Sequence, residues 1–187
     1  MRILLVGSGA REHAIAEAIK RSPRKPGLIA YMGANNPGIA SLSERTAVGD
    51  YKDFAAVGKF ASGADFAVIG PEGPLENGIV DFLGENGVPC FGPRKDLAQL
   101  ETSKSFTREL FRKYNIPGMP KFKVCSYVEE AGDFIDGLGG SYVIKADGLM
   151  AGKGVKLSGE HLKSRREALA FAGECIKRHG RVVVEEK

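Results

Sequence analysis

Cysteine is scarce in this sequence of 187 residues, and its placement excludes two common roles. Cys90, Cys125 and Cys175 are odd in number, lie far apart and form no C-x-x-C pair. Such a set indicates neither a disulfide framework nor a zinc site. We therefore expect a reducing, cytoplasmic compartment. The three histidines have no ligand-like spacing either, so we expect no metal site among these residues.

Long hydrophobic runs and basic stripes interleaved with aromatic residues are also absent. No apolar stretch approaches the roughly 20 residues that span a bilayer. Met1 leads into a short apolar segment without the features of a signal peptide, so we expect neither membrane insertion nor secretion. The net charge of +4 suits anionic ligands. However, no basic stripe is interleaved with aromatic residues, so no nucleic-acid partner is expected.

Glycine, by contrast, is abundant, with 25 residues in an otherwise ordinary globular composition of 43% hydrophobic and 27% charged residues. Ordering a glycine costs more backbone entropy than ordering an alanine. The glycines therefore indicate special turns or loops that contact ligands.

The first part of the chain alternates between predicted strands and helices. The strands cover 2–6, 28–32, 66–69 and 88–91, and the helices follow the first strand and cover 51–61 and 77–83. This βαβ series predicts a parallel sheet with right-handed crossovers and with ligands at the carboxyl ends of its strands. In the first helix we expect a core stripe of Ala14, Ile15, Ala18 and Ile19.

A second unit is predicted after a helical connection over 95–113, which ends at Asn115 and the prolines 117 and 120. Its predicted helices cover 129–138 and 162–178, and its predicted strands cover 142–145, 155–157 and 182–186. We therefore expect an N-terminal domain over 1–100, a connection and linker over 101–121, and a second domain over 122–187.

The first glycine turn, residues 7–12, begins like the G-x-G-x-x-G dinucleotide fingerprint but has Glu12 in place of the third glycine. No acidic residue ends the second strand, so a nicotinamide dinucleotide is disfavoured. The turn still lies at a helix N-terminus, which favours an anion, and Arg11 could clamp it. Alternatively, the glycines only permit a tight turn, and Glu12 and His13 cap the helix.

The stretch from Lys145 to Val155 contains three glycines within seven residues between two predicted strands. Hydrogen bonds to a nucleotide triphosphate could offset the cost of ordering this loop, and its lysines add positive charge. The Walker A spacing is absent, and the loop joins neighbouring strands as a flap does. The alternative is a solvated, inert hairpin. Lys104 on its own could be a surface residue.

Four motifs occur in the order known from one family. They are Gly7-x-Gly9-x-Arg11-Glu12-His13-Ala14, Gly70-Pro71-Glu72-x-Pro74-Leu75, Leu100-Glu101-x-Ser103-Lys104 and the stretch from Lys145 to Val155. Over its whole length the chain resembles the phosphoribosylamine-glycine ligase family of ATP-grasp enzymes. Single motifs are shared more loosely with biotin carboxylase and with purine-pathway carboxylases and formyltransferases.

The resemblance implies an α/β fold, in which a Rossmann-like, pre-ATP-grasp domain with a parallel sheet binds a phosphosugar and precedes the smaller subdomain of an ATP-grasp fold. The ATP-binding residues that it implies are Lys104, Lys145, Gly148, Gly152, Lys153, Gly154, Glu185 and Glu186. The substrate-binding residues that it implies are Gly9, Arg11, Glu12, Asn36, Pro37, Gly38, Gly70, Pro71 and Glu72.

The family's reaction belongs to de novo purine synthesis. ATP phosphorylates the carboxylate of glycine, and the amine of phosphoribosylamine attacks the glycyl phosphate to give glycinamide ribonucleotide, ADP and phosphate. The resemblance places the ligands of Mg²⁺ (or Mn²⁺) and most catalytic residues beyond Lys187, so we expect these residues alone to be inactive. Another ATP-grasp ligase or carboxylase and a non-catalytic ligand-binding fragment remain alternatives, and the oligomeric state stays open.

Overall fold

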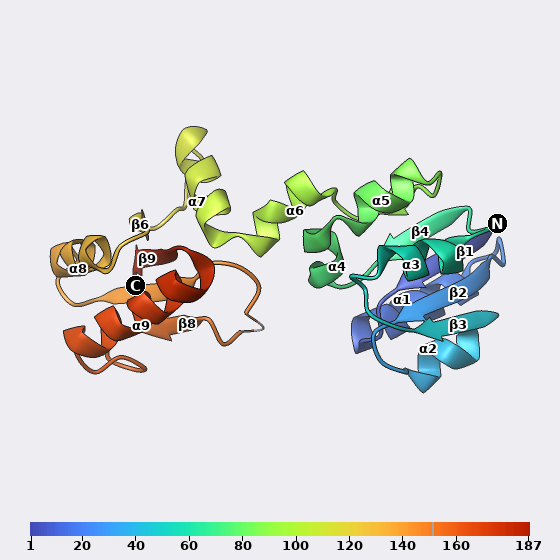
Figure 1. Cartoon of the computed structure of the whole chain (residues 1–187), viewed down its shortest axis with the longest axis horizontal. Coiled ribbons are helices and arrows are strands. Elements are labelled where there is room, and N and C mark those ends of the chain that lie inside the picture. Colours follow the sequence, from blue (N-terminus) through green and yellow to red (C-terminus); the bar gives the residue numbers. More distant parts are fainter. Residues whose placement is uncertain (151) are drawn as a thin grey trace. The chain divides into compact units, whose positions relative to one another are not determined.

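The computed structural model describes residues 1–150 and 152–187, so Ala151 of the glycine-rich motif lies outside the described residues. The chain divides into two compact units, Met1–Ala98 and Gln99–Lys187 (Figure 1). The boundary falls within helix α6 (Lys95–Thr102). Each unit contains its own sheet.

The first unit is built on a five-stranded sheet with the order β3-β2-β1-β4-β5. Every neighbouring pair in it is parallel, which confirms the predicted parallel sheet. The strands are β1 (Arg2–Val6), β2 (Gly27–Met32), β3 (Arg45–Val48), β4 (Phe66–Ile69) and β5 (Cys90–Phe91). Strands β1 and β2 are continuous apolar runs because helices cover both of their faces.

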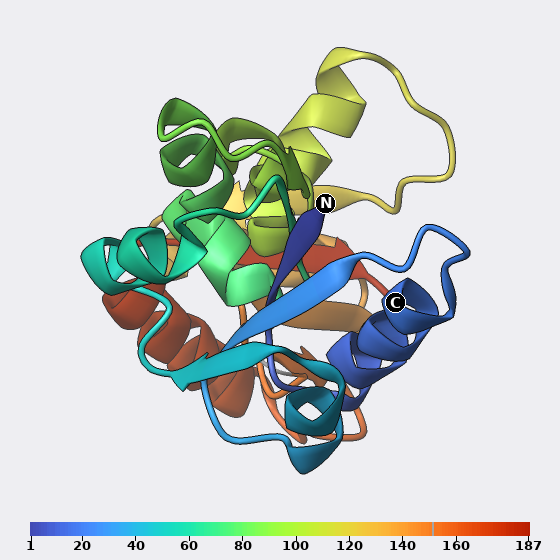
Figure 2. The same ribbon diagram turned by 90° about the vertical axis from the view of Figure 1, so that its right-hand side faces the viewer.

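Helices α1 (Ala10–Arg21) and α2 (Pro37–Leu42) lie on one face of this sheet, and α3 (Phe54–Ala61) and α5 (Ile79–Glu85) lie on the other (Figure 2). The short helix α4 (Glu72–Asn77) follows β4. Residue 78 separates α4 from α5, because Gly78 adopts a left-handed conformation with φ 91°. The expected helix over 77–83 corresponds mainly to α5, and α4 was not predicted.

The expected core stripe of α1 is partly wrong. Ile15 and Ile19 contact the core, but Ala14 and Ala18 are exposed, and Ala16 is the fully buried alanine. The physical reason is Glu12, whose side chain is drawn inward by hydrogen bonds in the preceding turn and so fixes which face of the helix points to the sheet. Ala14, Ala16 and Ala18 are alike in size and polarity, so the sequence alone does not show which of them faces the sheet.

The second unit contains a four-stranded sheet with the order β6-β9-β7-β8, in which every neighbouring pair is antiparallel. Its strands are β6 (Phe122–Cys125), β7 (Tyr142–Ala146), β8 (Val155–Leu157) and β9 (Val182–Glu186). Helices α8 (Val128–Gly137) and α9 (Arg165–His179) cover one face, and α7 (Lys104–Lys113) contacts β9. Strands β7 and β8 are neighbours, so the glycine-rich segment joins adjacent strands.

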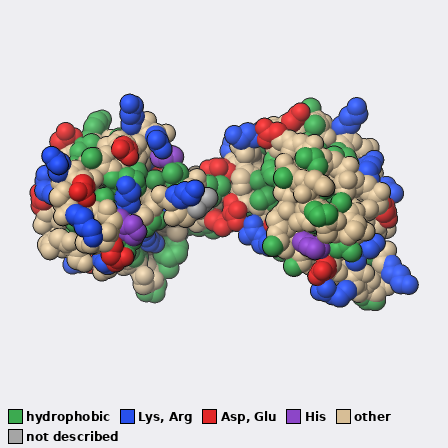
Figure 3. All heavy atoms as spheres, turned by 90° about the horizontal axis from the view of Figure 1, so that it is seen from below, with side chains coloured by type: hydrophobic (Ala, Val, Ile, Leu, Met, Phe, Trp, Pro, Cys, Tyr) green, Lys and Arg blue, Asp and Glu red, His purple; other side chains and the backbone are tan. Residues whose placement is uncertain are grey.

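None of the helices in the described part of the chain combines the length and apolar character that crossing a membrane requires. On the face shown in Figure 3, Lys and Arg side chains are scattered among acidic and apolar ones in both units. The side chains described on this face thus form no single large charged patch.

Candidate functional site

Three turns of the first unit, residues 7–12, 33–38 and 70–74, follow the carboxyl ends of β1, β2 and β4, where the βαβ pattern predicts ligand sites. The Asn36 Nδ2 donates a hydrogen bond to the Ser8 carbonyl oxygen at 3.0 Å, which joins the second turn to the first. Both terminal nitrogens of Arg11 donate to Glu72 Oε1 at 3.0 Å, which joins the first turn to the third. The structure thus brings these predicted substrate-binding residues together.

Glu12 is the buried centre of this cluster, with a residue exposure of 4%. Its carboxylate accepts hydrogen bonds from the Gly9 backbone N–H at 2.7 Å and from Arg11 Nε at 3.1 Å. A Cβ added at Gly9 would lie 2.8 Å from Glu12 Oε2, and one at Gly7 or Gly70 would lie closer still to this side chain. Glu12 therefore makes the capping contact of the alternative interpretation and explains why glycines surround it.

Arg11 is paired and not free to clamp an anion as it stands. Its side chain is 57% exposed and lies between Glu12 and Glu72. The hydrogen bonds to Glu12 and then to Glu72 raise the pKa of Arg11. A hydrogen bond from its own backbone N–H lowers the pKa of the Glu72 carboxyl, burial opposes that effect, and Arg11 adds to it. An incoming anion would compete with Glu72 for the guanidinium group.

The second turn, around Asn36, is shaped by a helix cap. Asn36 Oδ1 accepts from the N–H groups of Gly38 at 3.0 Å and Ile39 at 3.2 Å, and Pro37 occupies the first turn of α2. Gly38 has no side chain, which allows the His13 ring to approach closely. In the third turn, Gly70 borders Glu12, and Pro71 is the residue before α4.

The second unit contains a pocket of about 220 Å³ that is lined by both predicted phosphate-binding lysines, Lys104 and Lys145. We call it the basic pocket, and its lining residues are Leu100, Glu101, Lys104, Thr107, Arg108, Lys145, Val155 and Glu185. Lys104 starts helix α7, and Lys145 lies on β7. The structure therefore brings Lys104, Lys145 and Glu185 into one site, although they are far apart in the sequence.

Glu185 holds the cations of the basic pocket in place. Its side chain is 3% exposed and accepts from Arg108 Nε at 2.6 Å and from Lys145 Nζ. Burial disfavours the charged carboxylate, but the hydrogen bonds from Arg108 and Lys145 outweigh burial and lower the pKa of Glu185. Arg108 was not among the predicted site residues, and its position one helical turn after Lys104 is the sequence signal that could have indicated it.

Glu186, also predicted to bind ATP, points the other way. Side chains alternate along a strand, so Glu186 lies on the face of β9 opposite to that of Glu185. Its carboxylate accepts from the Lys121 backbone N–H at 2.8 Å. This carboxylate fixes the entry to β6 and does not line the basic pocket.

A buried carboxylate, Asp147, supports the lysine at the start of α7. It is 4% exposed, accepts a hydrogen bond from Ser105 Oγ at 2.6 Å, and forms an ion pair with Arg181, whose Nε lies 2.7 Å away. Burial opposes ionisation, but hydrogen bonds from Ser105 and the charge of Arg181 lower the pKa of Asp147. Sequence reasoning missed this network, although Asp147 lies inside the motif.

The glycine-rich segment is tied to this network at its first glycine. Lys104 Nζ donates to the Gly148 carbonyl oxygen at 2.9 Å. Gly148 and Gly152 have φ angles of 95° and 78°, which favour glycine. Gly154 is buried, and a Cβ there would meet the Met150 side chain at 2.6 Å. Lys153 is exposed.

No cluster of three or more His, Cys, Asp or Glu side chains among residues 1–150 and 152–187 could hold a metal ion. The lysines, the arginine and the backbone groups of the basic pocket offer charge neutralisation and hydrogen bonding.

Comparison with known proteins places this geometry in a class. The family model for the ATP-grasp (A) domain of phosphoribosylglycinamide synthetase matches residues 102–187, and the model for the N domain of the same enzyme matches residues 1–101. An N5-carboxyaminoimidazole synthetase from Staphylococcus aureus, complexed with ADP, shares the fold with a TM-score of 0.80 at 16% identity, covering 100% of this chain and 47% of that one. The fold and site thus define an ATP-grasp protein.

The two adjoining domain matches identify the family more closely, and the chain belongs to the phosphoribosylglycinamide synthetase family. It is 47% identical to a phosphoribosylamine-glycine ligase from Methanopyrus kandleri, covering 100% of this chain and 43% of the relative. A crystal structure of phosphoribosylamine-glycine ligase from Thermotoga maritima matches with a TM-score of 0.75 at 30% identity, covering 100% of this chain and 44% of that one. The chain spans less than half the length of these relatives.

Proposed function

We propose that this chain supplies a phosphosugar-binding unit and part of the ATP site of a phosphoribosylamine-glycine ligase. That enzyme joins glycine to 5-phosphoribosylamine and converts ATP into ADP and phosphate, a step of purine synthesis in the cytoplasm. The observation that carries the proposal is the convergence of Lys104, Lys145 and Glu185 in the basic pocket of a chain that belongs to this family.

On the nucleotide side, Lys104 and Lys145 neutralise the phosphate charge. Phosphoryl transfer depends mainly on positioning and charge neutralisation, which two lysines and an arginine in one pocket can supply. Glu185 positions Lys145 and Arg108 before the nucleotide arrives. The ADP bound to the Staphylococcus aureus protein of the same fold supports a nucleotide here.

The glycine-rich segment covers the phosphates in this proposal. Lys104 Nζ donates a hydrogen bond to the Gly148 carbonyl oxygen. When this lysine moves to bind a phosphate, the position of the glycine-rich segment therefore changes with it. Lys153, which is exposed, would turn toward the phosphates on closure, and Gly152 and Gly154 would present backbone N–H groups. Closure would exclude water and protect the reactive acyl phosphate of glycine from hydrolysis.

On the phosphosugar side, the three turns at the carboxyl ends of β1, β2 and β4 contact 5-phosphoribosylamine. The partial positive charge at the N-terminus of α1 attracts the phosphate group. Arg11 leaves its ion pair with Glu72 and binds the phosphate instead. The turns around Asn36 and Gly70 face the sugar. Glu12 does not contact the phosphosugar, since its carboxylate is buried, but it fixes the shape of the turn over residues 7–12.

Magnesium, when bound, would supply positive charge that offsets the negative charge of the phosphates. The described residues hold no acidic cluster for it, so the proposal assigns its ligands to none of them. Lys104, Lys145 and Arg108 are then the part of the charge neutralisation that this chain supplies.

The test is a hybrid in which this chain replaces the matching 43% of the Methanopyrus kandleri relative. We expect release of ADP that requires both glycine and 5-phosphoribosylamine, that is lost in Lys145→Ala and that persists in Lys177→Ala on an exposed turn of α9. A folded hybrid that releases ADP without glycine, or with bicarbonate or formate in its place, would show that the substrate assignment is wrong.

A further inference from the structure

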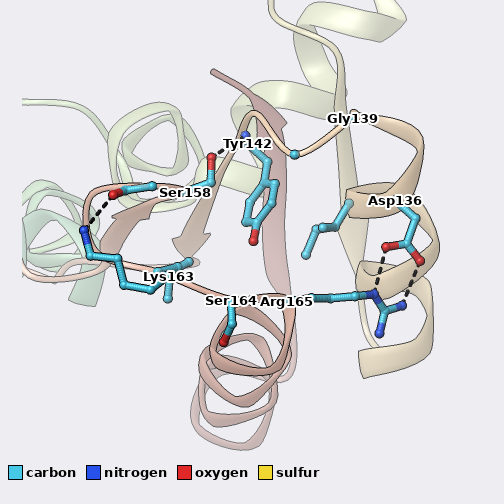
Figure 4. Close-up of a pocket in the computed structure, with 11 residues that line it drawn as sticks. Asp136, Gly139, Tyr142, Ser158, Lys163, Ser164 and Arg165 are labelled. Atoms are coloured by element: carbon cyan, nitrogen blue, oxygen red, sulfur yellow. Dashed lines mark hydrogen bonds and ion pairs between the residues drawn. The ribbon is translucent and has the colours of Figure 1, made fainter.

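A second pocket of about 400 Å³ lies in the second unit, away from the basic pocket. It is bounded by the end of α8, the start of β7 and the start of α9 (Figure 4). Tyr142 and Lys145 lie on the same strand, but alternation places them on opposite faces of the sheet. Tyr142 faces the helix-covered side, so this pocket and the basic pocket are separate sites.

Tyr142 is the feature that points to a ligand. The residue is 5% exposed, and its backbone N–H donates to Ser158 Oγ at 3.0 Å. Its hydroxyl group makes no hydrogen bond to any residue in the described ranges, and it points into the pocket (Figure 4). Among the described residues no fully buried polar side-chain atom lacks a partner, so this hydroxyl is open to the pocket, where a ligand can reach it. Burial raises the pKa of Tyr142, so at neutral pH the hydroxyl keeps its proton and can donate.

Two cations and a helix N-terminus border the same pocket. Lys163 Nζ donates to the Gly159 carbonyl oxygen at 2.7 Å, which leaves two of its three N–H groups available. Arg165, the first residue of the 15-residue helix α9, donates from Nε and Nη2 to Asp136 at 2.8 Å and keeps Nη1 available. The partial positive charge at the start of α9 adds to these donors.

Two apolar side chains also line the pocket. Ile135 and Leu162 are each 3% exposed and line the pocket beside the Tyr142 ring. Lys163, Arg165 and Asp136 together contribute a net charge of +1, which matches a singly charged group better than a phosphate dianion. Contact with Ile135 and Leu162 favours an anion that also carries an apolar body.

We propose that this pocket binds a small organic carboxylate, whose charged group accepts hydrogen bonds from the Tyr142 hydroxyl and Lys163 and whose apolar body contacts Ile135 and Leu162. The ligand is distinct from ATP, glycine and the phosphosugar of the proposed reaction, because the pocket opens on the other face of the sheet.

The experiment is a titration of the chain with benzoate, followed by backbone and tyrosine-ring NMR shifts. We expect saturable shifts at Tyr142 and Lys163, and an affinity about tenfold weaker in Tyr142→Phe, the size expected for one hydrogen bond to a charged group. Lys163→Gln should weaken binding to a similar degree. Tyr127→Phe, at a tyrosine of the same unit that is 67% exposed, is the matched control and should leave the affinity unchanged.

Two further probes define the ligand class. Benzyl alcohol has the same ring without the charge, and inorganic phosphate has charge without the apolar body, so neither should give saturable shifts at Tyr142. Absence of saturation by benzoate, equal affinity in Tyr142→Phe and in the unsubstituted chain, or equal binding of benzyl alcohol or phosphate would each overturn the proposal. Tyr142→Phe removes a hydroxyl group without a partner, so its thermal unfolding should match that of the control.

Discussion

At the scale of single residues, the basic pocket depends on one buried carboxylate that two cations share. Glu185 pairs with both Arg108 and Lys145 and offsets part of their combined charge. A buried ion pair is weak evidence for stability in itself, but removing one partner leaves charge without compensation. Glu185 is therefore the residue whose loss should reveal most about the pocket.

Glu185→Gln should lower the free energy of unfolding of the second unit by roughly 2 to 4 kcal/mol, because two cations would face a neutral amide. The loss should be smaller than for a fully buried pair because Arg108 and Lys145 are 21% and 23% exposed, so water screens them. Urea unfolding measures the change. Glu186→Gln is the control and should cost much less, since an amide oxygen can still accept from Lys121. Equal losses in the two variants would contradict this role for Glu185.

Two buried carboxyls with lowered pKa in the second unit predict its response to acid. Asp147 and Glu185 have folded pKa values below those of the unfolded chain, which lie near 4. The unfolded state therefore takes up protons first as the pH falls, so their stabilisation is complete above about pH 4 and is lost as the pH drops through the folded values. Urea unfolding across this range should show stability falling with pH, less steeply in Asp147→Asn. An equal slope in that variant would exclude Asp147 from the effect.

At the scale of elements, helix α2 shows how a short segment is fixed by its ends. It has six residues, too few to be stable alone, and its cap Asn36 also bonds the first turn. Asn36→Ala should destabilise the first unit by about 1 kcal/mol or somewhat more, because it removes both the cap and the link to Ser8. Thermal unfolding checks this against Asn35→Ala, the exposed neighbour, which should be nearly neutral. A loss of equal size in Asn35→Ala would show that the cap is not responsible.

The elements that the sequence predicted are those with a strong apolar signal. Strand β1 and most of β2 are continuous apolar runs and were placed correctly. Strand β3 (RTAV) was missed because it is mostly exposed and carries no such run, and α2 was missed because six residues show no helical period. The helix predicted from residue 51 begins at Phe54, because Asp53 caps α3 by accepting a hydrogen bond from the Ala56 backbone N–H.

For the candidate site, the sequence indicated residue types but not their partners. Lys104 and Lys145 were indicated by resemblance to a family, and the structure shows that they share a pocket. The bonds of Asp147 to Ser105 could not be predicted, because the two residues are 42 positions apart and no period or spacing links them. Contacts of this kind depend on how elements pack, which local patterns do not encode.

At the scale of the whole molecule, two separate cores support two kinds of ligand surface. Most buried apolar residues of the described ranges fall into clusters that each lie within one unit, two in residues 1–98 and one in residues 99–187. Each unit is thus described with a core of its own.

Leu4→Ala should therefore destabilise the first unit by about 2 to 5 kcal/mol through loss of buried contacts and a residual cavity. Hydrogen exchange followed by mass spectrometry should show faster exchange in β1, β2 and β4, with little change in β7 and β9. Ile144→Ala is the reciprocal variant in the other core and should show the reverse pattern. Equal acceleration in both units for either variant would mean that their stabilities are coupled.

The central claim is that the basic pocket binds a nucleotide, and calorimetric titration of the 187-residue chain with ADP tests it most directly. We predict saturable binding that is weakened about tenfold or more in Lys145→Ala, because one charge-assisted contact to phosphate is lost, and unchanged in Lys177→Ala. No saturable binding, or equal affinity in the two variants, would contradict the claim.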